Sequence, residues 1–229
     1  MSAGNRAPLK LAILISGRGS NMVAITRTCL EGNINARVEV VISDRPNAGG
    51  LATARELGIE ALAVSWQSAG GRDGFERIAR ETIDAREVDL VVLAGFMRIL
   101  SPEFTAHYAG RMLNIHPSLL PKYTGLHTHQ RALEAGDTEH GASVHFVTAE
   151  LDGGPLILQS KVAVHAGDTE EQLASRVQVT EHAIYPRVIG MMADGRLTWD
   201  AGRVRLDGKL LDTPLVESFS AHADRKSVV

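Results

Sequence analysis

Three polar side chains in the second half of the chain, Asn114, His116 and Asp152, could together handle a developing negative charge and a mobile proton. Asparagine offers a neutral amide donor, histidine carries a proton near pH 7, and a carboxylate can stabilise the imidazolium form of that histidine. The three suit a reaction that passes through an oxyanion. A lone histidine is more often structural, however, and the sequence alone does not bring Asp152 to His116.

A glycine-rich loop, Ser16-Gly17-Arg18-Gly19-Ser20-Asn21, separates the first predicted strand from the first predicted helix. Backbone N–H groups and the helix dipole attract an anion at such a corner, and Ser20 and Asn21 add side-chain donors. A dinucleotide fingerprint would need a third glycine where Met22 stands, and a Walker loop would need a lysine after its last glycine. The loop therefore favours a monophosphate, and the alternative is that its glycines only turn a tight corner.

Other candidate chemistries are weaker. His127 and His129 are two residues apart at the start of a predicted helix, whereas ligands on one helical face are three or four apart, so capping and packing are favoured over metal binding. Cys29 lies in a patterned helical segment and is expected to be an inert small hydrophobe. The chain contains no Gly-x-Ser-x-Gly elbow for a serine nucleophile. We therefore expect direct transfer without a covalent enzyme intermediate and without a metal.

The elements that must position these residues alternate regularly through about residue 95. Short β-branched runs predict buried strands, and apolar residues three and four apart predict helices. The predicted strands are 11–15, 38–42, 60–64 and 90–94, and the predicted helices are 21–30, 49–57 and 74–85. This alternation predicts a parallel sheet with right-handed crossovers and ligand-binding loops at the carboxyl ends of its strands.

After Gly95 the pattern changes. A short predicted strand, 111–113, precedes Asn114 and His116. The next predicted elements are a helix 128–135, two strands 142–148 and 156–164, and a long helix 168–193 that Asp168 would cap. A hairpin of 197–199 with 204–206 follows. No linker of biased composition and no internal repeat divides the chain. We therefore predict one domain over 9–210, with halves 9–100 and 101–210, between loose polar tails 1–8 and 217–229.

The composition describes an ordinary soluble globular protein of 229 residues, with 44% hydrophobic residues, 22% charged residues and a net charge of -3. The slightly acidic balance and 4% aromatic content argue against nucleic-acid binding, and the single cysteine excludes a disulfide scaffold. The chain starts without a signal-peptide pattern and has no apolar run near the ~18 residues that span a bilayer. We therefore expect a cytoplasmic protein.

Several long motifs, in one order and spacing, closely resemble the phosphoribosylglycinamide formyltransferases, the folate-dependent glycinamide ribonucleotide (GAR) transformylases of purine biosynthesis. The similarity spans roughly residues 9–210, and its motifs are 15–21, 92–102, 114–123, 125–129, 140–147, 151–155 and 178–186. The resemblance implies an α/β, Rossmann-like formyltransferase fold with a mostly parallel sheet flanked by helices and antiparallel strands in the C-terminal half. Residues 9–100 would bind the phosphate, and 101–210 would bind folate and carry the chemistry.

The resemblance also implies roles for individual residues. The implied contacts with GAR are Gly19, Ser20, Asn21, Gln178, Val179, Thr180 and Glu181, with the first three on the phosphate and Glu181 on the glycine amine. The implied folate contacts are Arg72, Met97, Arg98, Ile99, Leu100, Asn114, Thr148, Ala149, Glu150, Leu151 and Asp152. The implied catalytic residues are Asn114, His116 and Asp152, and Arg72 would meet the glutamate tail of the folate.

The implied reaction is attack of the GAR amine on the formyl carbon of 10-formyltetrahydrofolate, the cosubstrate, in IMP biosynthesis. Protonated His116 and the Asn114 amide would stabilise the oxyanion of the tetrahedral intermediate, His116 could serve the leaving nitrogen, and Asp152 would stabilise and orient the imidazolium. Two positions depart from the family pattern or vary within it: Thr124 replaces a usual proline, and Arg18 in the phosphate loop is expected to face solvent.

Three alternatives remain at this point. Formyltetrahydrofolate hydrolase and methionyl-tRNA formyltransferase share the catalytic trio, but each usually carries a further domain for which this chain has no room, and the near-neutral charge does not suit tRNA. A catalytically silent nucleotide-phosphate binder or metabolite sensor is the alternative from a different class. Apolar helix faces are also compatible with a homodimer.

Overall fold

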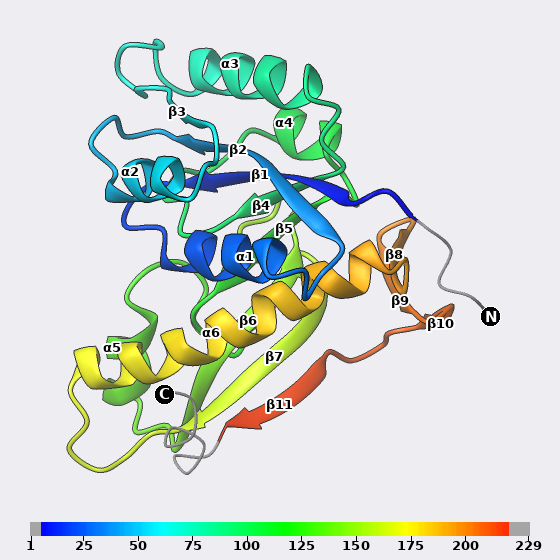
Figure 1. The fold of residues 1–229 in the computed structure, drawn as a ribbon. Helices are drawn as coiled ribbons and strands as arrows, with labels where there is room; N and C mark the ends of the chain where they lie inside the picture. Colours follow the sequence, from blue (N-terminus) through cyan, green and yellow to red (C-terminus); the bar gives the residue numbers. More distant parts are fainter. Residues whose placement is uncertain (1–5, 220–229) are drawn as a thin grey trace.

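One large sheet runs through the computed structural model, which describes residues 6–219 (Figure 1). Its strands are β1 (Leu9–Ile15), β2 (Ala36–Ser43), β3 (Ala61–Ala63), β4 (Leu90–Leu93), β5 (Met112–His116), β6 (Glu139–Phe146), β7 (Leu156–Ala163) and β11 (Leu215–Phe219). They lie in the order β11-β7-β6-β5-β4-β1-β2-β3. Among them β6 alone runs antiparallel to its neighbours, and the remaining pairs are parallel.

Helices cover both faces of this sheet, as Figure 1 shows. They are α1 (Ser20–Leu30), α2 (Gly49–Glu56), α3 (Arg72–Asp84), α4 (Pro102–His107), α5 (Thr128–Glu134) and α6 (Glu170–Ala193). Alternate residues of β1 enter two separate cores, with Ile13 packed under α1, α2 and α6, and Leu14 packed under α3 and α4. Burial on both faces explains why these strands are continuous apolar runs.

The direction of strand addition reverses beside β1. The chain adds β2 and β3 on one side of β1, then crosses to the other side and adds β4 and β5. Ligands of open α/β sheets bind outside the carboxyl ends of the strands at such a switch point. In one row across the sheet, Leu14 pairs with Leu93, Leu93 with Asn114, and Asn114 with His145. This row brings the first loop and the predicted chemical residues to one edge.

The expected fold class is confirmed, and most predicted elements differ from the structure by one to three residues at their ends. The hairpin is also present, as β8 (Leu197–Asp200) paired with β9 (Arg203–Leu206) and extended by β10 (Lys209–Leu210). Two local expectations were wrong. Thr169 rather than Asp168 caps α6, in a reciprocal capping box with Gln172, while Asp168 binds Arg176 at 2.7 Å. Asn114 and His116 lie within β5 and not after it.

The expectation of a loose C-terminal tail was wrong for Glu217–Phe219. These residues belong to β11, which joins the edge of the sheet parallel to β7, with Leu215 opposite Leu158. An ion pair between Arg187 of α6 and Glu217 also holds this segment. Parallel pairing with a distant strand leaves little local signal, which explains the error. The short helix α4, with Ser101 as its cap and Pro102 in its first turn, was also missed. Residues 1–5 and 220–229 of the predicted tails lie outside the described residues.

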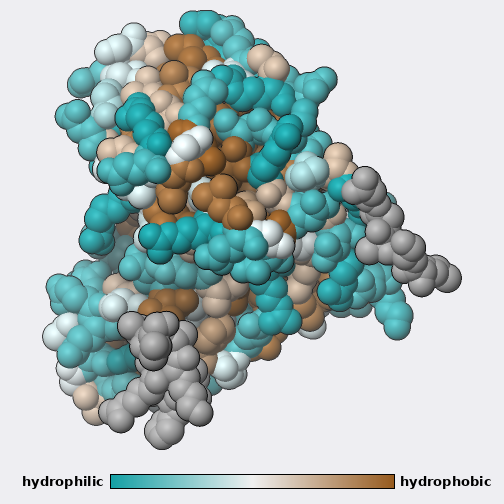
Figure 2. All heavy atoms as spheres, in the orientation of Figure 1, coloured by the Kyte–Doolittle hydropathy of each residue, from teal (hydrophilic) through white to brown (hydrophobic). Residues whose placement is uncertain are grey.

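Hydrophilic side chains dominate the face seen in Figure 2, and hydrophobic ones gather around β2, between α1 and α3. Within residues 6–219, none of the helices has the length and apolar character that crossing a membrane requires.

Candidate active site

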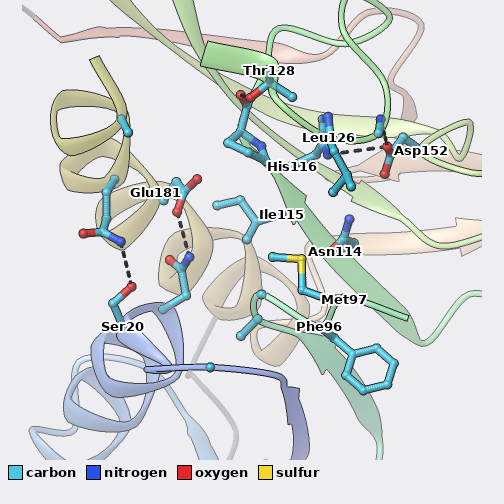
Figure 3. Close-up of a pocket in the computed structure, with 18 of the residues that line it drawn as sticks. Ser20, Phe96, Met97, Asn114, Ile115, His116, Leu126, Thr128, Asp152 and Glu181 are labelled. Atoms are coloured by element: carbon cyan, nitrogen blue, oxygen red, sulfur yellow. Dashed lines mark hydrogen bonds and ion pairs between the residues drawn. The ribbon is translucent and has the colours of Figure 1, made fainter. Parts of the chain in front are cut away.

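A cavity of about 630 Å³ opens at the carboxyl ends of β1, β4 and β5. Its walls come from the glycine loop, from the segment after β4, from β5 and the loop that follows it, from the loop between β6 and β7, and from one side of α6. Figure 3 shows Ser20 and Glu181 on one side of this space and Asn114, His116 and Asp152 on the other. Both predicted clusters therefore line a single cavity.

The glycine loop forms the entrance to α1. Gly19 adopts a left-handed conformation with φ 73°, and a Cβ atom there would lie 3.2 Å from the Met22 side chain, so glycine suits both the turn and the packing. The Ser20 hydroxyl is held by Gln178, whose Nε2 donates to its Oγ at 3.1 Å. Arg18 is exposed, as expected, at the cavity rim. The open first turn of α1 presents N–H groups that can bind an anion.

A buried acid lies beside this loop. Glu181 is 8% exposed, and its Oε2 accepts from Asn21 Nδ2 at 2.8 Å. Burial raises the pKa of the Glu181 carboxyl, while the bond from Asn21 opposes that shift. The opposite amide atom, Asn21 Oδ1, is buried without a hydrogen-bond partner among the described residues. Two acceptors in one buried corner suit a ligand that donates several hydrogen bonds, such as an amine.

The position of Glu181 is set one helical turn further along α6. The Tyr185 hydroxyl lies 2.9 Å from the Leu93 carbonyl oxygen and 3.1 Å from that of Leu113. Tyr185 is completely buried, so this contact ties α6 to the carboxyl end of β4 and to the first residues of β5. Residues four apart share a helical face, and Glu181 therefore points to the same side as Tyr185, over the cavity.

His116 and Asp152 lie side by side across the cavity from Glu181. His116 ends β5, and its Nδ1 is 3.5 Å from Asp152 Oδ2 (Figure 3). The other ring nitrogen, Nε2, is 2.8 Å from the carbonyl oxygen of Tyr123. Because a carbonyl oxygen can only accept, Nε2 carries a hydrogen, and Nδ1 is the atom that can gain or lose a proton. The exchangeable proton of His116 therefore faces the carboxylate.

The loop that carries Asp152 is itself held in place. Asp152 adopts φ 52°, a left-handed conformation, and its Oδ2 accepts from the Gly125 N–H at 2.9 Å. This bond links the loop between β6 and β7 to the loop after β5. This charge-assisted hydrogen bond therefore couples the Asp152 loop to the loop that follows His116.

Asn114 shares the face of β5 with His116, because residues two apart in a strand point the same way. Its Nδ2 lies 3.2 Å from Nε2 of His145, which is directly opposite on β6. Asn114, His116 and Asp152 thus meet within one corner of the cavity, a contact that their residue types alone did not establish. The corner contains an amide donor, a ring nitrogen able to carry a proton, and a carboxylate.

Apolar side chains are exposed at the cavity wall between the two polar clusters. Met97, Ile99, Leu126 and Leu151 are each more than half exposed, which suits a flat apolar ligand. The backbone that carries Met97 is fixed from below, since its N–H donates to the Ser16 hydroxyl at 2.8 Å. That hydroxyl donates to the buried Asp44 at 2.6 Å.

The same buried carboxylate holds the next residue of the segment. Arg98 Nε lies 2.7 Å from Asp44 Oδ2, and its guanidinium stacks over Trp66 with 4.7 Å to the ring centroid. Asp44 follows β2, so one buried acid connects the ends of β1, β2 and β4. This network fixes the apolar wall relative to the glycine loop.

The cavity brings together twelve of the expected site residues: Gly19, Ser20, Asn21, Met97, Arg98, Ile99, Asn114, His116, Leu151, Asp152, Gln178 and Glu181. It does not include Arg72, Leu100, Thr148, Ala149, Glu150, Val179 and Thr180. Leu100 packs in the core, Val179 is 52% exposed, and the Thr180 hydroxyl bonds Ser160 at 2.7 Å. Arg72 opens α3. The ligand contacts expected of these seven residues stay predictions.

Three residues that support the cavity through hydrogen bonds are not among the candidate site residues of the sequence: Ser16, Asp44 and His145. Asp44 directly follows a buried strand, and that position was an available signal. The contact of His145 with Asn114 depends on the register of an antiparallel pair, which residue types alone do not reveal.

His127 and His129 both line the cavity. His127 adopts φ 57° at the start of α5 and makes no side-chain capping bond, so the expected capping was wrong, while His129 packs in the structure with its Nδ1 3.1 Å from His140 Nε2. Burial raises the pKa of the Cys29 thiol to about 11, which keeps it protonated. Over residues 6–219, no group of three or more histidine, cysteine or acidic side chains is arranged to hold a metal ion.

The histidine pair predicts a loss of stability in acid. Burial, and then the neighbouring His129, lower the pKa of His140 to about 4. As the pH falls below the ordinary value of 6.5, the unfolded chain binds a proton that folded His140 resists. The free energy of unfolding should therefore fall between pH 6.5 and about 4. Urea unfolding should be measured at several pH values across this range, and the free energy of unfolding plotted against pH. This plot should be less steep for His140→Gln than for the wild type or for the control His165→Ala, in which an exposed histidine is replaced. Equal steepness in all three proteins would contradict the assignment.

Gly154 predicts a second effect on stability. A Cβ atom there would lie 1.8 Å from the carbonyl oxygen of Phe146, so Gly154→Ala must displace the ends of β6 and β7. We expect a loss of about 1–3 kcal/mol in the free energy of unfolding. Gly49→Ala is the control, because its Cβ would meet no atom within 4 Å. Equal urea midpoints for the two variants would show that the β6–β7 turn accommodates the methyl group.

The fold and the site define an α/β protein of Rossmann-like topology with its ligand cavity at the switch point of the sheet. Residues 9–189 match the sequence pattern of the formyl transferase family. The chain therefore belongs to the formyl transferase family, and within it to the phosphoribosylglycinamide formyltransferases.

Two relatives and one solved structure illustrate this membership. The chain is 54% identical over 203 residues to the phosphoribosylglycinamide formyltransferase of Escherichia coli (strain K12), covering 89% of this chain and 96% of that protein. It is 41% identical to the human trifunctional purine biosynthetic protein adenosine-3, over 81% of this chain and 18% of that protein. It superimposes on the phosphoribosylglycinamide formyltransferase of Coxiella burnetii with a TM-score of 0.87 and 47% identity, covering 91% and 99% of the two chains.

Proposed function

We propose that this chain transfers the formyl group of 10-formyltetrahydrofolate to the primary amine of GAR, giving N-formyl-GAR and tetrahydrofolate in purine (IMP) biosynthesis. One observation carries the proposal: a single cavity joins an anion-binding loop and a buried acid to an amide, a histidine and a carboxylate that suit oxyanion chemistry. The names of the relatives support formyl transfer to GAR.

GAR would bind along the wall formed by α1 and α6. Its phosphate would accept hydrogen bonds from the backbone and side chains of Gly19–Asn21, where the Ser20 hydroxyl is already oriented by Gln178. Its amine would reach the corner where Glu181 and the unpartnered Asn21 Oδ1 offer acceptors. These contacts would orient the lone pair of the amine nitrogen toward a formyl carbon held beside His116 and Asp152 on the opposite wall.

The formyl folate would lie on the apolar wall. Met97, Ile99 and Leu126 offer exposed apolar surface to its ring system, and the network of Ser16 and Asp44 fixes the backbone beneath it. The loop that carries Leu151 and Asp152 would close against the formyl end. The predicted contacts of Thr148, Ala149, Glu150 and Leu100, and that of Arg72 with the glutamate tail, belong to this proposal.

The transfer would proceed through one tetrahedral intermediate. The amine nitrogen forms a bond to the formyl carbon, and the carbonyl electron pair moves to oxygen, where an N–H of Asn114 and the positive charge of the His116 imidazolium stabilise the oxyanion. One proton leaves the attacking nitrogen and one reaches N10 of the folate, with His116 as the carrier and Asp152 stabilising the imidazolium. The carbon–N10 bond then breaks, so that the products are an N-formyl amine and tetrahydrofolate.

We further propose that the enzyme works in the cytoplasm with small-molecule substrates alone, and as a homodimer. The hydrophobic side chains around β2 in Figure 2 offer a surface that a second copy could cover. Sedimentation velocity over a hundredfold range of protein concentration tests this state. A single monomeric species throughout would remove the dimer from the proposal.

The acceptor is tested by measuring release of tetrahydrofolate from 10-formyltetrahydrofolate with and without GAR. We expect release to depend on GAR and to saturate with it. Release that is independent of GAR would instead identify a hydrolase, and binding of GAR without any turnover would identify a silent binding protein. Each of these two outcomes overturns the proposed function.

A further inference from the structure

His145 is a buried ring that contacts the proposed catalytic machinery from outside the cavity. It is 2% exposed on β6, directly opposite Asn114 on β5. Its Nδ1 lies 2.8 Å from the Phe146 carbonyl oxygen, and its Nε2 lies 3.2 Å from Asn114 Nδ2. It is absent from the residues that line the cavity, so a direct contact with the substrate is not its role.

The two hydrogen-bond contacts of this ring determine where its hydrogen is, because the third polar neighbour, Asp152 Oδ1, lies 4.0 Å from Nε2 and is beyond hydrogen-bond range. A carbonyl oxygen only accepts, so Nδ1 must carry the hydrogen that bonds Phe146. Burial lowers the pKa of His145, partly offset by that backbone bond and by Asp152, so the ring stays neutral near pH 7. A neutral ring with hydrogen on Nδ1 has a bare Nε2, which can only accept a hydrogen bond.

A bare nitrogen at this place selects one of two orientations of the Asn114 amide. With the amide nitrogen toward His145, an N–H meets the ring lone pair at 3.2 Å. With the amide reversed, the oxygen of Asn114 would face that lone pair, and two buried acceptors would lie against each other without a hydrogen. The second N–H of the correctly oriented amide is then available to a ligand in the cavity.

We propose that His145 is a positioning residue for formyl transfer, which fixes the Asn114 amide so that its N–H, and not its oxygen, meets the developing oxyanion. The inference rests on the function proposed above. Without His145 the amide could rotate, and a carbonyl oxygen facing the oxyanion would oppose the reaction. The effect should fall on kcat, because the oxyanion exists only after the substrates have bound.

Two replacements of His145 separate this role from packing. His145→Leu removes the acceptor, and we expect it to lower kcat by about 10- to 100-fold, somewhat less than the loss of an oxyanion donor itself. His145→Gln places an amide oxygen near the position of Nε2 and should retain most of the wild-type kcat. The KM values of both substrates should change by less than about threefold in either variant.

A double-mutant cycle with Asn114→Ala supplies a readout that a merely structural role would not move. Because His145 acts through Asn114, adding His145→Leu to Asn114→Ala should lower kcat by less than about twofold. Independent, additive losses, or a His145→Leu enzyme with wild-type kcat, would overturn the inference. Absence of transfer in the wild type would instead refute the proposed function itself, so the two failures are distinguishable.

A measurement on the unchanged protein keeps the inference testable if His145→Leu does not fold. In protein labelled with ¹⁵N-histidine, the nitrogen shifts of His145 should report hydrogen on Nδ1 and a bare Nε2 between pH 6 and 8. Hydrogen on Nε2 would reverse the preferred orientation of Asn114 and contradict the proposal.

Discussion

His116→Ala and Asp152→Asn are each expected to lower kcat for formyl transfer by at least about a hundredfold, the scale on which loss of one oxyanion donor acts. His116 Nδ1, 3.5 Å from Asp152, is the ring nitrogen left to exchange a proton, because Nε2 is bonded to Tyr123. The alanine variant loses the proton carrier, and the asparagine variant loses the charge that stabilises the imidazolium. Steady-state rates at saturating concentrations of both substrates measure the effect.

His165→Ala is the matched control, because that exposed histidine lies outside the cavity. We expect it to retain wild-type kcat. Circular dichroism and urea midpoints of all three variants separate loss of chemistry from loss of fold. Near-wild-type turnover in both His116→Ala and Asp152→Asn would remove these residues from the mechanism.

Glu181→Gln is expected to lower kcat/KM for GAR by about 10- to 100-fold, since a hydrogen bond to a charged partner contributes about 1.5–3 kcal/mol. The KM for 10-formyltetrahydrofolate should not change, because the acid lies on the opposite side of the cavity from Asn114 and Met97 (Figure 3). The variant should not be less stable. Burial raises the pKa of Glu181, so the folded state binds the carboxyl proton more tightly than the unfolded chain does. As the pH rises above the ordinary pKa of a glutamate, the ionised carboxylate therefore lowers the free energy of unfolding, and glutamine removes this cost.

This combination of lower activity with equal or higher stability distinguishes a binding acid from a structural one. Glu171→Gln is the matched control on the same helix, because Glu171 is exposed and outside the cavity. Initial rates over a range of GAR concentrations, together with urea midpoints near pH 7.5, test both parts. A Glu181→Gln enzyme that is destabilised but kinetically normal would refute the assignment of Glu181 to the amine.

The sequence predicted the layout of the first half of the chain because the signals there are local. Buried runs such as 11–15 and 90–94 are continuous and apolar, and the helices between them repeat at three and four. The glycine loop could be recognised as a candidate anion site for the same reason, since its position between a strand and a helix is a local property. The resemblance to a known family then supplied the substrates and most of the site residues.

Contacts between distant segments could not be predicted in this way. Asp152 reaches His116 only because β5 and the β6–β7 loop converge, and His145 meets Asn114 only through the register of β5 with β6. The edge strand β11 was missed for a related reason, because Leu215 pairs with Leu158 far along the chain. Asp44 was also not predicted as a site residue, although its carboxylate accepts hydrogen bonds from both Ser16 and Arg98 below the cavity.

One measurement tests the central claim most directly: a single turnover with 10-formyltetrahydrofolate labelled with ¹³C in the formyl group and GAR labelled with ¹⁵N in its amine, followed by nuclear magnetic resonance. Direct transfer predicts one ¹³C–¹⁵N bonded product, seen by its one-bond coupling, for each tetrahydrofolate formed. Labelled formate in place of that product, or no turnover at all, would contradict the account.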